Sequence, residues 1–226
     1  MNTRPYVSVN MAMSIDGRIS TRNREQITLG THRDRYLMDT LRAAYDAVIV
    51  GAGTVRHDGF PVLVRDEEIR CRRASRGRSP HPVNVVLSRT LNMPVARPIF
   101  DRTDTEKIIF TTRRAPDTRV RRFRKRAEVV VLPRQTLTPR AVLAQLSKRG
   151  IKKVLLEGGG EIHFAFARAQ CVDEIYITVT PRLIGGVGAP TILDGRGFLR
   201  ADHLKLELVS CRRAEDEVFL RYRVKY

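Results

Sequence analysis

Short apolar runs separated by helical stretches constrain the fold of this chain more than any other feature. The run at residues 47–50 (AVIV) contains no polar residue and ends at Gly51, which is typical of a strand buried on both faces. Similar runs follow at residues 83–87, 107–110, 129–132 and 154–156. Stretches with helical spacing lie at residues 139–149 and 162–169. This alternation predicts an α/β sheet whose strands are largely parallel.

The N-terminal part adds a strand and a helix to this pattern. Residues 5–13 have the composition of a strand, and the turn residues 14–17 (SIDG) follow them. Apolar side chains recur at helical spacing over residues 31–45, behind Thr31 as the expected N-cap. We therefore expect a strand, a turn and a helix in this order.

The C-terminal part has a different pattern. Residues 174–180, 205–211 and 217–225 have strand propensity, and no helical stretch separates the last two. The fold class is therefore α/β, with helices around a mixed, mostly parallel sheet that ends in antiparallel C-terminal strands. Residues 65–82 are rich in Arg, Ser and Pro without an apolar period, so we expect a mobile surface loop there.

Composition places the chain among single-domain globular proteins. With 226 residues, 42% of them apolar and no low-complexity tract, residues 1–226 are expected to form one domain. No apolar run approaches the ~18 residues that a membrane span needs, and no signal-peptide pattern is present at the start, so we expect a cytoplasmic protein.

Neither the net charge nor the Cys and His residues predict a nucleic-acid partner or a metal site. The formal net charge is +18, yet 35 of the 42 basic residues are Arg, and the basic stretches lack interleaved aromatic residues that could stack bases. Nucleic acid is therefore not the expected partner. The three Cys and five His are scattered, so we expect no metal site.

Two glycine-rich turns follow predicted buried strands. They are residues 51–54 (GAGT) and residues 157–160 (EGGG). Three successive glycines lose much backbone entropy on folding, so a close approach of the backbone to a ligand explains them better than tolerance does. Both turns follow strand ends, where open α/β sheets bind ligands, and backbone amides at a helix start suit an anion. Together they predict a phosphate-bearing cofactor, although neither matches the GxGxxG fingerprint of the Rossmann fold.

Longer motifs make the prediction specific. Residues 6–19 (YVSVNMAMSIDGRI), 41–58 (LRAAYDAVIVGAGTVRHD), 155–160 (LLEGGG), 172–174 (VDE) and 181–186 (PRLIGG) occur in this order. In sequence and order they resemble the signatures of the riboflavin-pathway pyrimidine reductases, a branch of the dihydrofolate-reductase-like fold. This family comprises ribosylaminopyrimidine 5′-phosphate reductases and the reductase domain of bifunctional riboflavin deaminase-reductases.

The resemblance implies NADPH as the cofactor. It assigns Ala12, Thr54 and Asp58 to the nicotinamide and its ribose, and Ser88 and Arg89 to the adenosine 2′-phosphate. The helix start that follows the second glycine-rich turn would hold the pyrophosphate, through residues Gly158, Gly159, Gly160 and Glu161.

The resemblance also implies a phosphorylated pyrimidine as the substrate. Arg42 and Arg65 match positions that contact the substrate phosphate, Glu157 matches one that hydrogen-bonds the substrate, and Asn10 stands where many relatives have Lys. Asp58 and Glu157 are the expected catalytic residues. The reaction would be hydride transfer from C4 of NADPH to C1 of an opened ribosylamine, giving a ribityl chain. Relatives of this fold usually pair, so a homodimer is expected.

Several alternatives stay open at this point. The base could be a diaminopyrimidinone or an aminouracil, and the stereochemistry of hydride transfer is undetermined. A paralogous reductase could act on a dihydropterin or another pyrimidine, although the lack of Trp is unlike a dihydrofolate reductase. A basic binding protein without catalysis is the alternative from another class.

The chain departs from the family pattern at three places. Asp58-Gly59-Phe60 replaces the usual Asp-Asp-Pro, and Ser88-Arg89 replaces Asp-Ser. A Ser that is common before the first helix is replaced around Glu25-Gln26.

Overall fold

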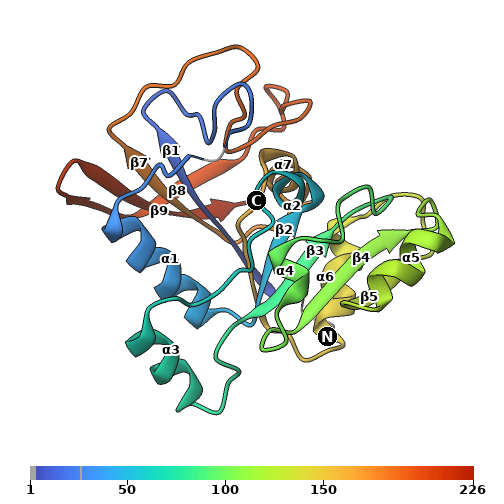
Figure 1. The fold of residues 1–226 in the computed structure, drawn as a ribbon. Helices are drawn as coiled ribbons and strands as arrows, with labels where there is room; N and C mark the ends of the chain where they lie inside the picture. Colours follow the sequence, from blue (N-terminus) through green and yellow to red (C-terminus); the bar gives the residue numbers. More distant parts are fainter. Residues whose placement is uncertain (1–3, 26) are drawn as a thin grey trace.

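A nine-stranded sheet forms the centre of the protein in a computed structural model that describes residues 4–25 and 27–226 (Figure 1). Gln26, part of the third departure, lies outside the described residues. The strands are β1 (Tyr6–Ser14), β2 (Ala47–Gly51), β3 (Val83–Leu87), β4 (Lys107–Thr112), β5 (Glu128–Leu132), β6 (Lys153–Leu156), β7 (Glu174–Thr180), β8 (Lys205–Ala214) and β9 (Glu217–Lys225).

The strand order is β5-β4-β3-β2-β6-β1-β7-β9-β8. All pairs from β5 to β7 are parallel, whereas β9 pairs antiparallel with both β7 and β8. A mixed, mostly parallel sheet with antiparallel C-terminal strands is thereby confirmed. Strand β6 lies between β1 and β2, so the ends of strands that are distant in the sequence meet beside one another.

Helices cover both faces of the parallel part. They are α1 (His32–Ala44), α2 (Ala52–His57), α3 (Glu67–Ala74), α4 (Pro98–Asp101), α5 (Asp117–Arg124), α6 (Pro139–Ser147) and α7 (Gly160–Arg168). Side chains of α6 and α7 share one apolar core, and side chains of α1, α4 and α5 share the other. In the part of the chain that the structure describes, none of these helices could cross a membrane.

The apolar run of β2 is unbroken because successive side chains enter different cores. Ile49 joins the α6 and α7 side, where Leu143 also lies, whereas Val48 joins the α1 side with Leu41. This two-sided burial is the reason why a strand of this type has no polar residue.

The expectation of a mobile loop over residues 65–82 is wrong. Helix α3 occupies its first half, and the Asp66 side chain caps it by accepting a hydrogen bond from the Ile69 N–H at 2.9 Å. Arg73 then anchors the helix, because its buried guanidinium donates to the carbonyls of Ala43 and Tyr45, both at 2.7 Å. Helix α3 has only one buried apolar side chain, Ile69, so it shows no apolar period.

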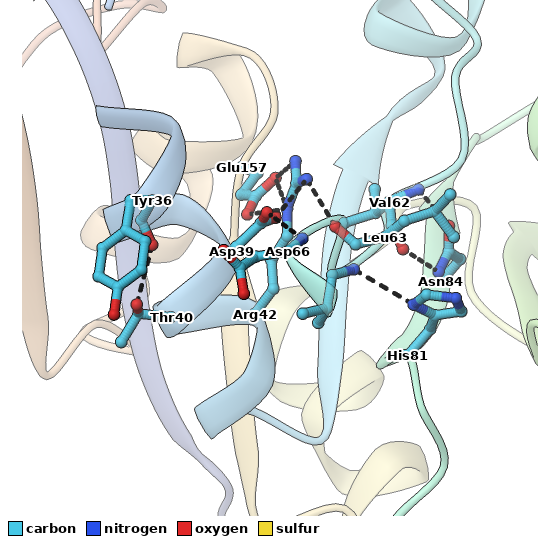
Figure 2. A network of polar contacts seen from close by, with 11 residues as sticks. Tyr36, Asp39, Thr40, Arg42, Val62, Leu63, Asp66, His81, Asn84 and Glu157 are labelled. Carbon is cyan, nitrogen blue, oxygen red and sulfur yellow. Dashed lines mark hydrogen bonds and ion pairs between the residues drawn. The ribbon is translucent and has the colours of Figure 1, made fainter. Parts of the chain in front are cut away.

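Residues 59–66 have an extended course outside the sheet and are held by side chains of other elements (Figure 2). Asn84 on β3 accepts from the Val62 N–H at 2.7 Å and donates to its carbonyl at 3.0 Å. The ring of His81 accepts from the Val64 N–H at 3.2 Å. From α1, Asp39 accepts from the Asp66 N–H at 2.9 Å. The segment is thus fixed from two sides, with little regular backbone pairing of its own.

This arrangement makes Asn84 important for stability. Asn84→Ala leaves the buried N–H and C=O of Val62 without partners, so the free energy of unfolding should fall by about 1–3 kcal/mol. Urea denaturation measures the change. Asn23→Ala, at an exposed loop position, is the control and should stay within about 0.5 kcal/mol. Equal stability of both variants would show that Asn84 does not hold the segment.

Candidate active site

A cleft of about 940 Å³ lies at the carboxyl ends of β2, β3 and β6. The residues that follow these strands line it, including Gly53, Ser88 and Gly159. Neighbouring parallel strands have their carboxyl ends on the same side of the sheet. Ligands of open α/β sheets bind at these strand ends, at the point where the strand order reverses. Both glycine-rich turns therefore belong to one cavity, as the sequence predicts.

The turn between β6 and α7 brings backbone to the cleft surface. A Cβ atom at Gly158 would lie 2.9 Å from the Thr54 hydroxyl and 3.1 Å from Val50, so only glycine fits there. Gly159 has a φ of +70°, and a Cβ atom at this position would meet nothing within 4 Å. Within the described residues, no side chain caps the start of α7. The N–H groups of Gly160 and Glu161 come before the first intrahelical hydrogen bond, which the Ile162 N–H donates to the Gly159 carbonyl at 3.0 Å, so they suit an anion such as a pyrophosphate.

At the end of β3, hydrogen bonds fix the backbone beside an exposed guanidinium. The hydroxyls of Thr111 and Thr112 donate to the Arg89 carbonyl at 3.3 and 2.9 Å, and the Ser88 N–H bonds to Phe110 at 3.0 Å. The Arg89 side chain is exposed at the cleft, so its guanidinium can reach a bound anion. A hydroxyl beside a guanidinium fits a phosphate monoester.

Asp58 ends the short helix α2 at the wall of the cleft. Burial raises the pKa of its carboxyl above the ordinary value, although the nearby His57 and Arg97 side chains oppose this shift. Gly59 has a φ of +64°, and a Cβ atom there would lie 2.7 Å from the Arg97 side chain. Phe60 is exposed, and neither Gly59 nor Phe60 lines the cleft.

A buried ion pair links the cleft to α1 (Figure 2). Arg42 donates from Nε and Nη2 to Glu157, at 2.9 Å to Oε1 and 2.6 Å to Oε2, and from Nη1 to the Leu63 carbonyl at 2.9 Å. Asp39 lies 3.9 Å from the same guanidinium. Burial by itself would lower the pKa of Arg42, but the carboxylates of Glu157 and Asp39 more than offset this and raise it.

The predicted cofactor residues mostly meet in this cleft. Its lining includes Thr54, Asp58, Ser88, Arg89, Gly158, Gly159, Gly160 and Glu161, together with Glu157 from the predicted substrate set. Ala12 is not in the lining, but its neighbour Met11 is. The assignment of these residues to NADPH stays a prediction.

The predicted substrate residues lie mainly behind the cleft, on the α1 side of the sheet. Asn10 is buried and follows Ser8 on the same face of β1, and Ser8 accepts a hydrogen bond from Tyr45 at the end of α1. Arg42 is buried, whereas Arg65 is exposed in the extended segment, and neither lines the cleft. Direct contact of these two arginines with a substrate phosphate stays a prediction.

The residue-level prediction missed a wall made of two loops. Ile19, Ser20 and Arg24 line the cleft from one loop, and Pro190 and Asp194 line it from the other. The motifs at residues 14–17 and 181–186 were visible in the sequence, but nothing in either motif indicates that the two loops meet. Among the described residues, no group of three His, Cys, Asp or Glu side chains could hold a metal ion.

The sequence matches a family model and is similar to two named reductases. Residues 5–220 match the model of the RibD C-terminal domain family. The chain is 36% identical over 197 residues to the 2,5-diamino-6-ribosylamino-4(3H)-pyrimidinone 5′-phosphate reductase of Archaeoglobus fulgidus, covering 87% of this chain and 90% of that protein. It is 33% identical to the enzyme of the same name from Methanothermobacter thermautotrophicus, covering 98% and 99%.

Solved structures show the same fold. A pyrimidine reductase-like protein from Corynebacterium diphtheriae has a TM-score of 0.84 and 25% identity, covering 98% of this chain and 92% of that one. A deaminase/reductase from Thermotoga maritima has a TM-score of 0.80 and 22% identity, covering 98% and 57%. These likenesses confirm the dihydrofolate-reductase-like fold.

The ion pair predicts strong coupling between Arg42 and Glu157. Either Arg42→Met or Glu157→Gln leaves one buried charge without its partner, whereas the double variant removes both charges. A double-mutant cycle of unfolding free energies, from urea denaturation, should give a coupling of about 1–3 kcal/mol.

Arg73→Met is the matched control in this cycle. Arg73 is also buried, but its guanidinium donates to carbonyls rather than to a carboxylate. Its effect should therefore add to that of Glu157→Gln within about 0.5 kcal/mol. Additive effects for Arg42 and Glu157 would contradict the coupling.

Proposed function

The chain belongs to the RibD C-terminal domain family, and from this membership and the geometry of the cleft we propose that it is an NADPH-dependent reductase of riboflavin biosynthesis. Its substrate would be a ribosylamino-pyrimidine 5′-phosphate, and its product the ribitylamino form. The observation that carries the proposal is the meeting of the uncapped start of α7 with Ser88 and Arg89 in one cleft. A dinucleotide with a 2′-phosphate needs anion sites of these two kinds.

We propose 2,5-diamino-6-ribosylamino-4(3H)-pyrimidinone 5′-phosphate as the specific substrate. The relatives from A. fulgidus and M. thermautotrophicus are named for reduction of this compound. An aminouracil substrate is the competing outcome, and comparing turnover of the two pyrimidine phosphates with NADPH distinguishes them.

In the proposed complex, Ser88 and Arg89 bind the 2′-phosphate, and the backbone of residues 158–161 binds the pyrophosphate. Ala12, Thr54 and Asp58 would contact the nicotinamide and its ribose. The fit is supported by the open space beside Gly159, where any side chain would project into the cleft. On the substrate side, Asn10, Arg42, Arg65 and Glu157 would hold the base and the phosphorylated chain.

The bound cofactor would supply a hydride. Reduction of the opened ribosylamine, an imine, adds this hydride to C1′ and a proton to the nitrogen. We assign the proton donation to Asp58, because its carboxyl lies in the wall of the cleft, where burial raises its pKa above the ordinary value. Glu157 accepts hydrogen bonds from Nε and Nη2 of Arg42. In this fixed position it would accept a hydrogen bond from the substrate and orient the substrate.

We further propose a homodimer. Strand β8 is one of the two edge strands of the sheet, and every residue in it except Ala214 is exposed. Leu206, Leu208 and Val209 are between 38% and 52% exposed on this strand, which is an unusual amount of apolar surface for a free edge. Light scattering at micromolar concentration should give about twice the 25.8 kDa of one chain, and a mass near 25.8 kDa would contradict the dimer.

Cofactor choice tests the assignment of Arg89. NADPH should bind at least tenfold more tightly than NADH, because a charge-assisted hydrogen bond to the 2′-phosphate contributes about 1.5–3 kcal/mol. Arg89→Ala should reduce this preference while the unfolding midpoint stays unchanged. Fluorescence titration with each cofactor measures both affinities.

Arg126→Ala is the control for Arg89→Ala. Arg126 is also partly exposed but pairs with Asp101 at 2.9 Å and does not line the cleft. Its removal should leave the ratio of the two affinities within twofold of the parent. Equal affinity of the parent for NADPH and NADH would contradict the proposed cofactor.

A further inference from the structure

Two sequence motifs without a role in the proposed chemistry contact each other. Asp16, in the motif at residues 14–17, accepts hydrogen bonds from the backbone of Ile184 (Oδ1, 3.1 Å) and Gly185 (Oδ2, 2.7 Å) in the motif at residues 181–186. The Ser14 hydroxyl donates to the same carboxylate at 2.6 Å. One side chain thus joins segments that are about 170 residues apart in the sequence.

The contact continues along both loops, which lie side by side at one end of the sheet (Figure 1). The Ile15 N–H bonds to the Arg182 carbonyl at 2.9 Å, and the Ile19 N–H bonds to the Pro190 carbonyl at 3.0 Å. The Arg18 guanidinium donates to the Ala189 carbonyl at 2.8 Å. We call residues 14–20 and 181–191 together the paired loops.

Among the described residues, the paired loops bury little apolar surface next to Asp16. Their large apolar side chains at this end are turned outward, with Ile15, Leu183 and Val187 being 64%, 79% and 102% exposed. Since little apolar burial fixes this end, its course depends on the polar contacts to Asp16. Gly185 has a φ of +68°, and its N–H faces the carboxylate.

The hydrogen bonds to Asp16 act on its charged form. The Ser14 hydroxyl, followed by the Gly185 and Ile184 N–H groups, lowers the pKa of Asp16 to about 2. The carboxylate therefore stays ionised, and its contacts persist, throughout the pH range in which an enzyme of this kind would be assayed.

The far end of the paired loops forms a wall of the cleft. Ile19, Ser20 and Pro190 line the cleft there, and the bond between Ile19 and Pro190 joins the two loops at that point. Gly160 packs tightly below, since a Cβ atom at this residue would lie 2.4 Å from the Thr191 carbonyl. The position of this wall is thus linked to the start of α7.

We infer that Asp16 is a positioning residue, which holds the paired loops together so that their cleft-lining end stands against a dinucleotide bound at the start of α7. The identity of that dinucleotide, NADPH, rests on the proposed function. Asp16 itself does not line the cleft, so it acts through Ile19 and Pro190 rather than by touching the ligand.

Asp16→Ala and Asp16→Asn test this inference, with Asp46→Ala as the matched control. Asp46 also accepts two backbone hydrogen bonds, from Lys152 and Lys153 at 2.8 Å. It precedes β2 and therefore lies at the amino ends of the parallel strands, whereas the cleft lies at their carboxyl ends. Amide hydrogen exchange should become at least tenfold faster at Ile19 in Asp16→Ala, although this N–H does not contact Asp16. The Kd for NADPH, from fluorescence titration, should rise at least tenfold, and Asp16→Asn should be intermediate because its amide keeps one acceptor.

The control separates positioning from general stability. Asp46→Ala should lower the unfolding midpoint and leave both the Ile19 exchange and the Kd for NADPH within twofold of the parent. If Asp16→Ala changes either quantity no more than Asp46→Ala does, the inference is overturned. If the parent protein does not bind NADPH, the proposed cofactor is wrong, whereas the exchange at Ile19 still decides whether Asp16 holds the wall.

Discussion

The buried ion pair between Arg42 and Glu157 is the interaction on which the site depends most. Through this pair, helix α1 holds the end of β6. The same Arg42 guanidinium donates to the Leu63 carbonyl and so also holds the extended segment that follows Asp58. Two charges of this kind are expensive to bury, and their position at the cleft fixes the Glu157 carboxylate in one orientation. The same pair joins the α1 side of the sheet, where Asn10 lies, to the cleft lined by the glycine-rich turn.

The sequence predicts the parts of this fold that depend on local patterns. Strand β2 could be predicted because a strand between two cores has apolar residues at every position. The glycine-rich turn could be predicted because its backbone approaches the cleft, which requires glycine. Helix α3 was missed because its anchor is a buried arginine, Arg73, which is indistinguishable in sequence from a solvated one. The contact between Asp16 and Gly185 was missed because only the tertiary structure brings the two loops together.

Part of the high positive charge has a structural use. Arg42 and Arg73 are buried, and each donates to backbone carbonyls that regular secondary structure leaves unpaired. Arg221 pairs with the buried carboxylate of Glu174 at 2.6 Å and lies over the ring of Tyr176. Arginine suits such positions because its planar guanidinium donates several hydrogen bonds at once. Some of the arginines therefore connect helices, loops and strands through hydrogen bonds and ion pairs.

The most direct test of this account follows the transferred hydrogen. The purified protein is incubated with 2,5-diamino-6-ribosylamino-4(3H)-pyrimidinone 5′-phosphate and NADPH that carries deuterium at both C4 positions, and the product is examined by mass spectrometry and NMR. The account predicts a ribitylamino product that carries deuterium at C1′, with oxidation of one NADPH for each product molecule. The absence of any NADPH-dependent product from this compound and from its aminouracil counterpart would contradict it.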